Sequence, residues 1–435
     1  MKPLVYCIIC PPHWTKTPPL GLEFIRKYNE DKGITVKILD LNILFYHLLK
    51  MNKRKWLSLN KEFEEDLFNL VKKRYPQVIE NILKKLKDAS LIGFSLFWRN
   101  KDFTYKFIEE IRRIYPHKKI VIGGPEVLLM KLRGEQLRKD INWVIGEGER
   151  SIEKILNCKH NLVVAYEEIE NLDEIPFLDF EGFNINYYSQ YLPLYTSRGC
   201  IKKCFFCTER RLSSRFRQHS SFYVVKQIEF LMKKFRTNYF IFQDSLINAN
   251  LQWLEQFLTL LVKKGLKIFW EAQMIVRKDF DYSLAKLCKK AGCFNLFIGL
   301  ESASNKVLSA MNKGFTKEEA LNFFSTLKKA ELHYEISLIV GYPVEKEEDF
   351  QETIQFLIHN KTIIPKIAQV NPYIDYLNLE ILVYIFCCKK YLHPLYLLPF
   401  ERFLLCFFRG KIRCNSAIHQ LAQGEFVNTK VSRKA

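Results

Sequence analysis

Short apolar runs alternate with amphipathic segments through the first 165 residues. An apolar run of about four to eight residues bounded by turn residues predicts a buried strand, whereas apolar residues recurring every three or four positions predict a helix. Strands are expected at residues 4–9, 35–39, 91–95, 120–122 and 143–145, and helices at 21–32, in a longer region ending near 87, at 103–115 and from 146 to about 156. This alternation predicts an α/β fold with a doubly wound parallel sheet covered on both faces.

The same alternation returns after residue 190. Strands are expected at residues 193–197, 239–244, 267–272, 295–300, 335–340 and 366–370, with helices at 223–235, 251–264, 283–291, 317–330 and 347–359. Between the two halves, residues 166–190 are acidic, contain Pro176 and follow neither period, which is typical of a linker. The sequence therefore predicts domains over residues 1–165 and 191–372, joined by a linker over 166–190.

The pattern changes after residue 372. Residues 377–408 are very apolar, but Lys389 and Lys390 divide this stretch, and Pro394 and Pro399 divide it further. A transmembrane helix needs about 20 uninterrupted apolar residues, so no transmembrane segment is predicted. We expect residues 373–435 to be a divergent or truncated carboxyl-terminal tail.

Composition narrows the class of protein. The chain has 435 residues, 48% of them hydrophobic, and 12 cysteines. The cysteines follow no regular disulfide spacing and the first apolar stretch is too short for a signal peptide, so a reduced, cytoplasmic protein is expected. The net charge of +20 suggests nucleic-acid binding. The lysines are, however, scattered over nearly every expected helix, which is typical of solvated faces, and nucleic acid is not expected as a partner.

Cys200, Cys204 and Cys207 carry the clearest chemistry in the sequence, spaced Cys-x3-Cys-x2-Cys. Three thiolates from one loop can hold three corners of a cubic iron–sulfur cluster and leave the fourth iron open for another ligand. Zinc is the alternative, but a structural zinc site needs four ligands, and no fourth cysteine or histidine follows at the usual spacing. The three cysteines are therefore predicted to hold a [4Fe-4S] cluster.

This motif, with Phe206 before its last cysteine, resembles the signature of the radical S-adenosylmethionine (SAM) enzymes. Residues 299–302 (Gly-Leu-Glu-Ser), 311–314 (Met-Asn-Lys-Gly) and 341–345 are similar to further segments of that family, although Val344 replaces a glycine. The resemblance implies a partial (β/α)6 barrel whose open iron binds SAM. The reduced cluster would cleave SAM to methionine and a 5′-deoxyadenosyl radical, with a flavodoxin- or ferredoxin-type electron donor. The residues it places near SAM are Phe206, Gln243, Asp244, Glu301, Ser302 and Gly341.

The first domain resembles the Rossmann-like cobalamin-binding domain of cobalamin-dependent radical SAM enzymes. The similar segments are residues 18–22, the end of the strand at 91–95, Gly-Gly-Pro at 123–125 and Gly-Glu-Gly-Glu at 146–149. Glycines at strand ends let backbone amides approach a ligand, and a helix beginning after Gly146 would add its free amides. The Asp-x-His-x-x-Gly motif of cobalamin mutases is absent, and His13 is expected to be a surface or packing residue and not a ligand. The resemblance implies cobalamin contacts from Ser95, Gly123, Gly124, Pro125, Gly146, Glu147 and Gly148.

Together the two resemblances imply methyl transfer from methylcobalamin to an unactivated carbon or phosphorus of a small or lipid-like substrate. Cobalamin-dependent radical cyclisation or rearrangement is an alternative. A tRNA-modifying radical SAM enzyme would explain the positive charge, but the extra cysteine-bearing domain or RNA-binding barrel of such enzymes is not visible in the sequence. A non-catalytic cobalamin sensor would not need the three cysteines.

Overall fold

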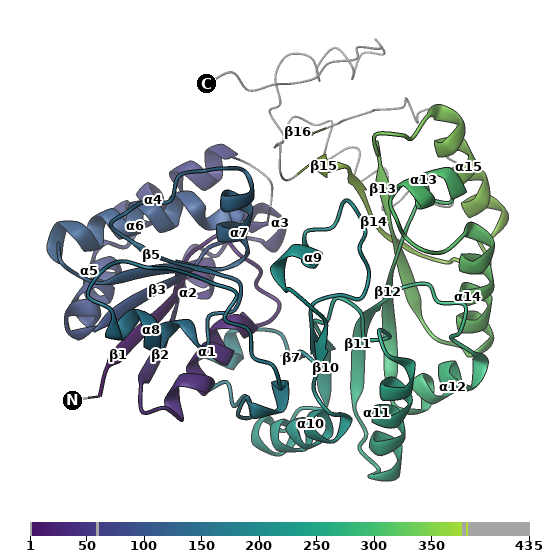
Figure 1. Cartoon of the computed structure of the whole chain (residues 1–435), viewed down its shortest axis with the longest axis horizontal. Helices are drawn as coiled ribbons and strands as arrows, with labels where there is room; N and C mark the ends of the chain where they lie inside the picture. The colour runs from purple at the N-terminus through teal and green to yellow at the C-terminus, as the bar shows by residue number, and fades with distance from the viewer. Residues whose placement is uncertain (1, 58–60, 376–379, 382–435) are drawn as a thin grey trace. The chain divides into compact units, whose positions relative to one another are not determined.

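The computed structural model describes residues 2–57, 61–375 and 380–381. The chain folds into two compact units (Figure 1). The first contains the described residues up to Pro193 together with residues 211–218 and 230–237. The second contains residues 194–210, 219–229 and the described chain from Asn238 onward. Two short segments that follow the cysteine motif in the sequence therefore pack within the first unit.

The first unit is built on a six-stranded sheet in the order β2-β1-β3-β4-β5-β6, and each strand is parallel to its neighbours. Its strands are β1 (Leu4–Ile9), β2 (Thr35–Asp40), β3 (Leu91–Ser95), β4 (Ile120–Gly123), β5 (Asn142–Ile145) and β6 (Val163–Ala165). Its helices are α1 (Leu20–Glu30), α2 (Leu41–Leu48), α3 (Lys53–Trp56), α4 (Lys61–Arg74), α5 (Pro76–Lys85), α6 (Lys101–Ile114), α7 (Pro125–Leu132) and α8 (Ser151–Asn157). The five predicted strands are confirmed, and β6 is an additional one.

Helices cover both faces of this sheet, because both faces of each central strand are apolar. Tyr6 and Ile8 of β1 belong to a large buried cluster with residues of α4, α5 and α6, including Phe103 and Phe107. Helices α1 and α8 lie on the other face (Figure 1). The doubly wound α/β arrangement predicted from the alternation is therefore confirmed.

The strand order reverses between β1 and β3, and this place in the sheet is its topological switch point. From β1 the chain moves outward to β2 on one side, and from β3 it moves outward through β4 and β5 on the other. The connections at the carboxyl ends of β1 and β3 consequently leave in opposite directions, and ligands of open α/β sheets bind in the crevice that this creates. The topology marks the residues after Ile9 and after Ser95 as the first place to look for a ligand in this unit.

The expected helix after β5 begins later than predicted. Helix α8 starts at Ser151 and not directly after Gly146, because residues 146–150 form an irregular turn. Gly146 has a φ of +94°, and Glu147 accepts a hydrogen bond from the backbone of Ile169 instead of starting a helix. The prediction that free helix amides follow Gly146 is thus wrong.

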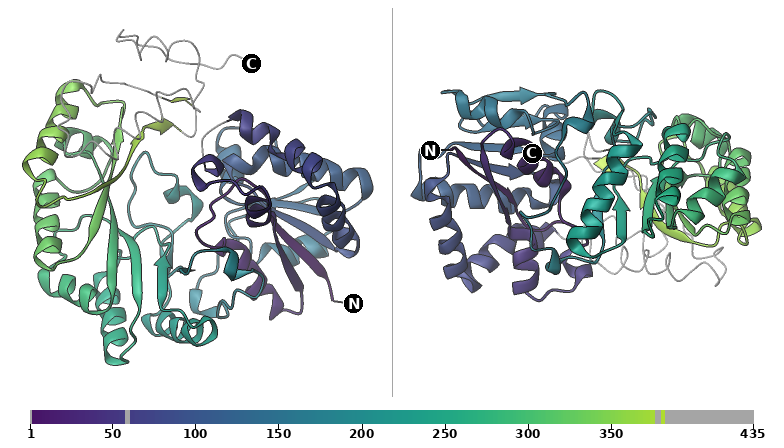
Figure 2. Two further views of the ribbon diagram at one scale, coloured as in Figure 1. Left: turned by 180° about the vertical axis from the view of Figure 1, so that it is seen from behind. Right: turned by 90° about the horizontal axis from the view of Figure 1, so that it is seen from below.

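The second sheet also has six strands, in the order β14-β13-β12-β11-β10-β7. Its strands are β7 (Leu192–Leu194), β10 (Tyr239–Phe242), β11 (Phe269–Met274), β12 (Cys293–Glu301), β13 (Tyr334–Val340) and β14 (Ile367–Pro372). The helices of this part are α9 (Glu209–Leu212), α10 (Ser221–Phe235), α11 (Leu251–Lys263), α12 (Tyr282–Lys290), α13 (Asn305–Ala310), α14 (Lys317–Lys329) and α15 (Glu347–His359). Helices α11, α12, α14 and α15 line the outer side of the curved sheet (Figure 2). This is the predicted partial (β/α)6 barrel.

The predicted strand at residues 193–197 is divided. Sheet pairing stops after Leu194, and Ser197–Arg198 forms a separate short strand, β8. The interruption has a local cause, since the backbone N–H of Thr196 donates to the carboxylate of Asp244, 3.0 Å away, in place of a neighbouring strand.

The acidic segment expected to be a linker, residues 166–190, is packed within the first unit. Its apolar residues Ile169, Leu172, Ile175, Leu178 and Phe180 are buried. They follow no regular period because the segment forms turns and short 3-10 helices, which bury side chains at irregular intervals. Low periodicity here reflects irregular backbone and not exposure to solvent.

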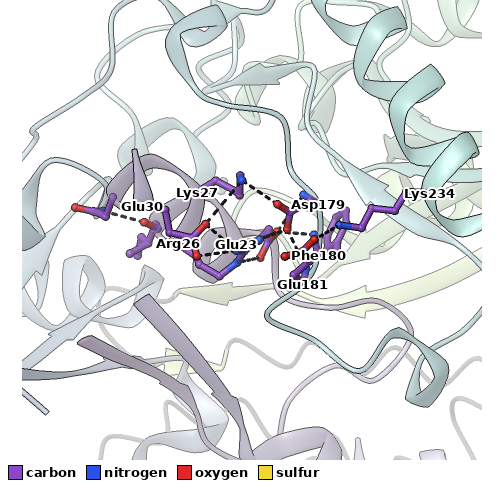
Figure 3. A network of polar contacts seen from close by, with 10 residues as sticks. Glu23, Arg26, Lys27, Glu30, Asp179, Phe180, Glu181 and Lys234 are labelled. Carbon is purple, nitrogen blue, oxygen red and sulfur yellow. Dashed lines mark hydrogen bonds and ion pairs between the residues drawn. The ribbon is translucent and has the colours of Figure 1, made fainter. Parts of the chain in front are cut away.

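Buried charges fasten this segment to helix α1 (Figure 3). Glu23, fully buried, accepts from the backbone N–H groups of Asp179 and Phe180 at 3.2 and 2.6 Å. Arg26 bonds Glu23 at 2.6 Å and also pairs with Asp179. Burial alone would raise the pKa of Asp179, but the hydrogen bond from Lys27 and the neighbouring cations hold it below its ordinary value. Helix α1 thus holds residues 179–181 through buried ion pairs and hydrogen bonds.

The predicted tail lies almost entirely outside the described residues. Of residues 373–435, the structure describes 373–375 and 380–381, where β15 (Ile374–Asp375) pairs antiparallel with β16 (Glu380–Ile381). Within the described ranges, every helix is too short or too polar to cross a membrane.

Replacing Arg26 with methionine should destabilise the protein strongly. The substitution leaves Glu23 and Asp179 without their shared cation, and breaking a buried ion pair costs about 3 to 5 kcal/mol. Urea unfolding followed by tryptophan fluorescence would measure the loss. Lys32→Met is the control, because its pair with Glu153 is 38% and 54% exposed and should contribute less than about 1 kcal/mol. Equal losses in the two variants would contradict this role of Arg26.

Candidate cofactor sites

The three cysteines lie in one loop that follows the first strand of the barrel. Gly199 opens the loop with a φ of +79°, a conformation that favours glycine. Within the loop, the N–H of Cys207 donates to the carbonyl of Cys204 at 3.2 Å, and the N–H of Lys202 donates to the Sγ atom of Cys200 at 3.4 Å. All three thiols are free. The donor set and its placement therefore fit a [4Fe-4S] cluster held by three thiolates.

The segment 311–314 supports this loop from outside. The N–H of Phe205 donates to the carbonyl of Met311 at 3.1 Å, and the side-chain amide of Asn312 donates to the carbonyl of Lys203 at 3.0 Å. Asn312 and Gly314 have φ values of +57° and +70°, so the chain turns sharply where it meets the cysteine loop. The Met-Asn-Lys-Gly segment noted in the sequence thus positions the backbone that carries the cysteines.

Burial disfavours ionisation of the Cys200 and Cys207 thiols in the metal-free protein. It raises the pKa of Cys207 to about 11, and it raises the pKa of Cys200 as well. Metal binding therefore releases protons here, because thiolates are the binding form. Among the described residues, no three metal-ligating side chains converge on a single ion. A cubic cluster does not require such convergence, since each thiolate binds a different iron.

Glu301 lies near the cysteine loop with an unusual backbone. It ends β12 at an irregularity in the pairing with β13 and has a φ of +70°. Its carboxylate accepts from Ser337 Oγ at 3.2 Å and lies 3.5 Å from Lys313 Nζ. Burial raises the pKa of Glu301, and the charge of Lys313 opposes that effect. The strained backbone and buried charge pair are features that often mark a functional site.

Lys313 and Phe206 extend this group. The ammonium of Lys313 lies 5.7 Å from the centre of the Phe206 ring, within cation–π range. Phe206 also packs against a small buried cluster formed by Val307, Met311 and Tyr342. The structure thus brings together Phe206 and Glu301, both predicted SAM contacts. Lys313 lies between them, although sequence reasoning gave it no role; the matched segment 311–314 was the available signal.

Ser302 and Gly341 lie in turns that follow neighbouring strands. Ser302 is fully buried and its Oγ atom lies 3.2 Å from Thr353 Oγ1. Gly341 has a φ of +84°, and its N–H donates to Glu345 at 2.6 Å. Burial raises the pKa of Glu345 to about 7. In this structure both residues are held by protein groups, and their contacts with SAM remain predictions.

Gln243 and Asp244 follow β10. The N–H of Gln243 continues the sheet by donating to Leu194 at 2.8 Å. Asp244 is fully buried and accepts from the backbone and hydroxyl of Thr196 and from the hydroxyl of Ser197, the last at 2.5 Å. Asp244 therefore fixes the backbone just before the cysteine loop. The predicted contacts of Gln243 and Asp244 with SAM also remain predictions.

In the first unit, Ser95, Gly123, Gly124 and Pro125 lie at the carboxyl edge of the sheet. Pro125 begins α7, and Gly124 has a φ of +103°. A side chain at Gly124 would place its Cβ 2.6 Å from the carbonyl oxygen of Leu96. The protein's own backbone, after β3, therefore requires glycine at this position, whatever ligand lies nearby.

The turn at Gly146, Glu147 and Gly148 lies at the same edge, after β5. A Cβ on Gly148 would lie 2.7 Å from the side chain of Ile25 on α1, so this glycine also permits close packing. Glu147 is held by Arg217 at 2.5 Å and by the N–H of Ile169 at 3.1 Å. The predicted cobalamin residues are thus gathered at one edge, but protein packing already explains two of their glycines.

Two exposed tryptophans lie where the strand order reverses. Trp14 follows β1 and Trp98 follows β3, and they are 43% and 49% exposed. Next to them in the sequence, the ring of His13 lies 4.2 Å from that of Phe97, and burial lowers the pKa of His13 to about 4, with Arg99 contributing. His13 therefore packs against an aromatic ring, as expected. Sequence reasoning passed over both tryptophans because their position at the switch point depends on strand order.

Residues 194–357 match the sequence profile of the Radical SAM superfamily. This part of the chain is a radical SAM domain. The match covers the cysteine loop and the strand ends at Glu301 and Gly341, and it confirms the predicted cluster and SAM as the cofactors of the barrel.

Among curated relatives, the chain is 27% identical over 303 residues to the uncharacterized methyltransferase PH0819 of Pyrococcus horikoshii, covering 64% of this chain and 66% of the relative. Among solved structures, the cobalamin-dependent SAM radical enzyme OxsB, with aqua-cobalamin and SAM bound, has a TM-score of 0.64 at 19% identity. That match covers 82% of this chain and 52% of OxsB. This chain thus spans about two thirds of the Pyrococcus relative and about half of OxsB.

The radical SAM methyltransferase TsrM of Kitasatospora setae, with cobalamin and a [4Fe-4S] cluster bound, has a TM-score of 0.65 at 16% identity. The match covers 86% of this chain and 75% of TsrM. These two structures have the same fold as this chain over both of its units.

Replacing Cys204 with alanine should abolish stable cluster formation, because two thiolates leave two irons of the cubic cluster without protein ligands. Iron and sulfide analysis after anaerobic reconstitution, together with the visible absorption spectrum, would check this. Cys158→Ala is the control, because Cys158 is a free cysteine outside the loop. Iron content equal to that of the unaltered protein in the Cys204 variant would overturn the assignment.

Proposed function

We propose that the protein is a cobalamin-dependent radical SAM methyltransferase. The observation that carries the proposal is the combination of three free thiols at the start of a radical SAM barrel with a parallel sheet whose order reverses at β1 and β3. The solved structures of OxsB and TsrM share both parts and contain cobalamin, which supports extending that cofactor to this chain.

The barrel residues would each contribute a distinct function. When bound, the cluster and SAM supply a 5′-deoxyadenosyl radical, and cobalamin supplies a methyl group. Cys200, Cys204 and Cys207 would hold the cluster, with segment 311–314 fixing their loop. The apolar group around Phe206 and Met311 would limit water near the reacting atoms, which strengthens the polar contacts that hold the bound groups in place.

Glu301 and Lys313 would orient the polar part of SAM. They form a buried pair beside Phe206 at the end of β12. Opposite charges that are already fixed and dehydrated can bind a zwitterionic ligand without further reorganisation. We propose that Gln243, Asp244, Ser302 and Gly341 complete the pocket through the turns that they stabilise.

In the first unit, we propose that cobalamin binds at the carboxyl edge of the sheet, over the switch point. The two exposed tryptophans offer flat apolar surface there, and the turns at Gly123–Pro125 and Gly146–Gly148 border the same edge. No residue is proposed as a ligand of cobalt from below. His13 would not serve because its ring is engaged with Phe97.

An acidic one-electron donor of the flavodoxin or ferredoxin type fits the surface of the cysteine loop. Ile201, Lys203 and Phe205 alternate with the cysteines and are exposed, so the loop presents positive charge and apolar surface next to the cluster. We propose a small or lipid-like substrate and a cytoplasmic location, where thiols stay reduced.

Anaerobic protein reconstituted with iron, sulfide and hydroxocobalamin, then given SAM and a low-potential reductant, should form both methylcobalamin and S-adenosylhomocysteine. These products would arise together, because reduced cobalamin would accept the methyl group from the sulfonium of SAM and S-adenosylhomocysteine would be the leaving group. Absorbance and mass spectrometry would detect them, and the Cys204→Ala protein serves as the control for cluster-dependent 5′-deoxyadenosine. Production of 5′-deoxyadenosine without methylcobalamin would favour cyclisation or rearrangement. Specific tRNA binding at physiological salt would favour an RNA-modifying enzyme.

Trp98→Ala should weaken hydroxocobalamin binding by about tenfold, because an aromatic contact of this size is worth roughly 1 to 2 kcal/mol. Equilibrium titration followed by the cobalamin spectrum would give the dissociation constant. Tyr282→Ala is the matched control, since Tyr282 is 49% exposed on α12 of the barrel. An unchanged dissociation constant in the Trp98 variant would rule out this position for the cofactor.

A further inference from the structure

Arg217 occupies a buried position within the first unit, although it belongs to the part of the chain that matches the radical SAM profile. Its guanidinium donates to Glu147 Oε1 at 2.5 Å, to the carbonyl of Ile169 at 2.7 Å and to Ser213 Oγ at 2.7 Å. Glu168 Oε1 lies 3.7 Å away. The side chains of Arg217, Glu147 and Glu168 are only 6%, 10% and 7% exposed.

The residues around Arg217 form a closed polar network. Glu168 accepts from Ser213 Oγ at 3.2 Å, from the N–H of Ser214 at 2.6 Å and from the Ser214 hydroxyl. Glu147 accepts from the N–H of Ile169 through its second oxygen. We name this group, Glu147, Glu168, Ile169, Ser213, Ser214 and Arg217, the Arg217 clamp. It joins the Gly146–Gly148 turn, the segment after β6 and the segment that follows the cysteine loop.

The guanidinium of Arg217 supplies positive charge to both carboxylates of the clamp. Two buried carboxylates share the guanidinium of Arg217, so removing it would leave two like charges close together in a region with little water. Among the described residues, Arg217 Nε has no hydrogen-bond partner, although it is buried. The clamp therefore contains a buried N–H donor, Arg217 Nε, without an acceptor among the described residues. It belongs to the side chain that holds the Gly146–Gly148 turn through Glu147.

The chain links the clamp directly to the cluster ligands. Arg217 follows Cys207 by ten residues, and these include the short helix α9. Glu209 at the start of α9 accepts from Ser245 Oγ at 3.2 Å. The stretch from Cys207 to Arg217 is thus fixed at both ends, so a change in the Gly146–Gly148 turn can be transmitted along it to the cysteine loop.

We propose that Arg217 is a positioning residue that couples occupation of the carboxyl edge of the first sheet by cobalamin to assembly of the iron–sulfur cluster. The proposal rests on the proposed function, since it takes cobalamin as the ligand at Gly146–Gly148. Coupling between two sites is reciprocal, so cluster assembly strengthens cobalamin binding by the same factor as cobalamin stabilises the assembled loop. Glu147 then serves to anchor the turn through Arg217 and not to contact the cofactor.

The test compares dissociation constants for hydroxocobalamin in metal-free and cluster-loaded protein under anaerobic conditions. In the unaltered protein, cluster loading should strengthen binding at least about fivefold, the lower end of typical coupling. In Arg217→Gln the two constants should agree within about twofold, with iron content retained. Arg217→Lys keeps the charge but loses the forked geometry, so it should retain cobalamin binding with coupling below about threefold.

Arg215→Gln is the matched control. Arg215 lies two residues away and pairs with Glu170 on the surface, where the two side chains are 51% and 67% exposed. It should leave the coupling unchanged. If Arg217→Gln does not fold, as judged by circular dichroism, Arg217→Lys decides the question.

Coupling that persists in the Arg217 variants, or equal affinities in both forms of the unaltered protein, would overturn the proposal. Failure of the unaltered, cluster-loaded protein to bind hydroxocobalamin would instead refute the proposed function, and with it the ligand that this inference assumes.

Discussion

Parallel strands bring all of their carboxyl ends to one edge of a sheet, and both units of this protein depend on that constraint. In the barrel it places the cysteine loop after β7, Glu301 at the end of β12 and Gly341 after β13, all at one edge although they are far apart in the chain. In the first unit it places Ser95, Gly123 and the turn at Gly146 along one edge. Neither set of residues would meet if the strands ran antiparallel, because their ends would alternate between two edges.

Buried charge determines how later parts of the chain join the first unit. Glu23 and Arg26 of α1 bind the backbone and carboxylate of residues 179–180, and Glu147 binds Arg217. In each case a buried acid needs a cation or N–H group, and a segment distant in sequence supplies it. Such interactions are specific because a shift of the segment would leave a charge unpaired in a medium that solvates it poorly. They explain why segments 166–190 and 211–218 are part of this unit.

The structure gives a packing reason for two of the glycines at the strand ends. Gly124 permits close approach of the Leu96 backbone, so a larger residue there would disturb the fold before it could block a cofactor, and Gly148 permits close packing of the Ile25 side chain. The exposed tryptophans at the switch point are better probes of a ligand, since their side chains contribute little to the core. A glycine motif and a ligand site can thus lie at the same edge without the glycines being contacts.

Local sequence determined the element types and the parallel α/β class, because apolar periodicity acts within short stretches of chain, and cysteine spacing in one loop was enough to predict the cluster ligands. The strands at residues 4–9 and 91–95 and the helix at 347–359 agree with the structure to the residue. Tertiary structure alone decided which distant groups met. These contacts join residues that are 48 or more positions apart in the sequence. They are Lys313 with Phe206, Asp244 with Thr196, and Arg217 with Glu147 and Glu168. The burial of the irregular segment at 166–190 was not predicted for the same reason. Its apolar residues are buried by other elements of the first unit, and the order of residues along the chain does not reveal those contacts.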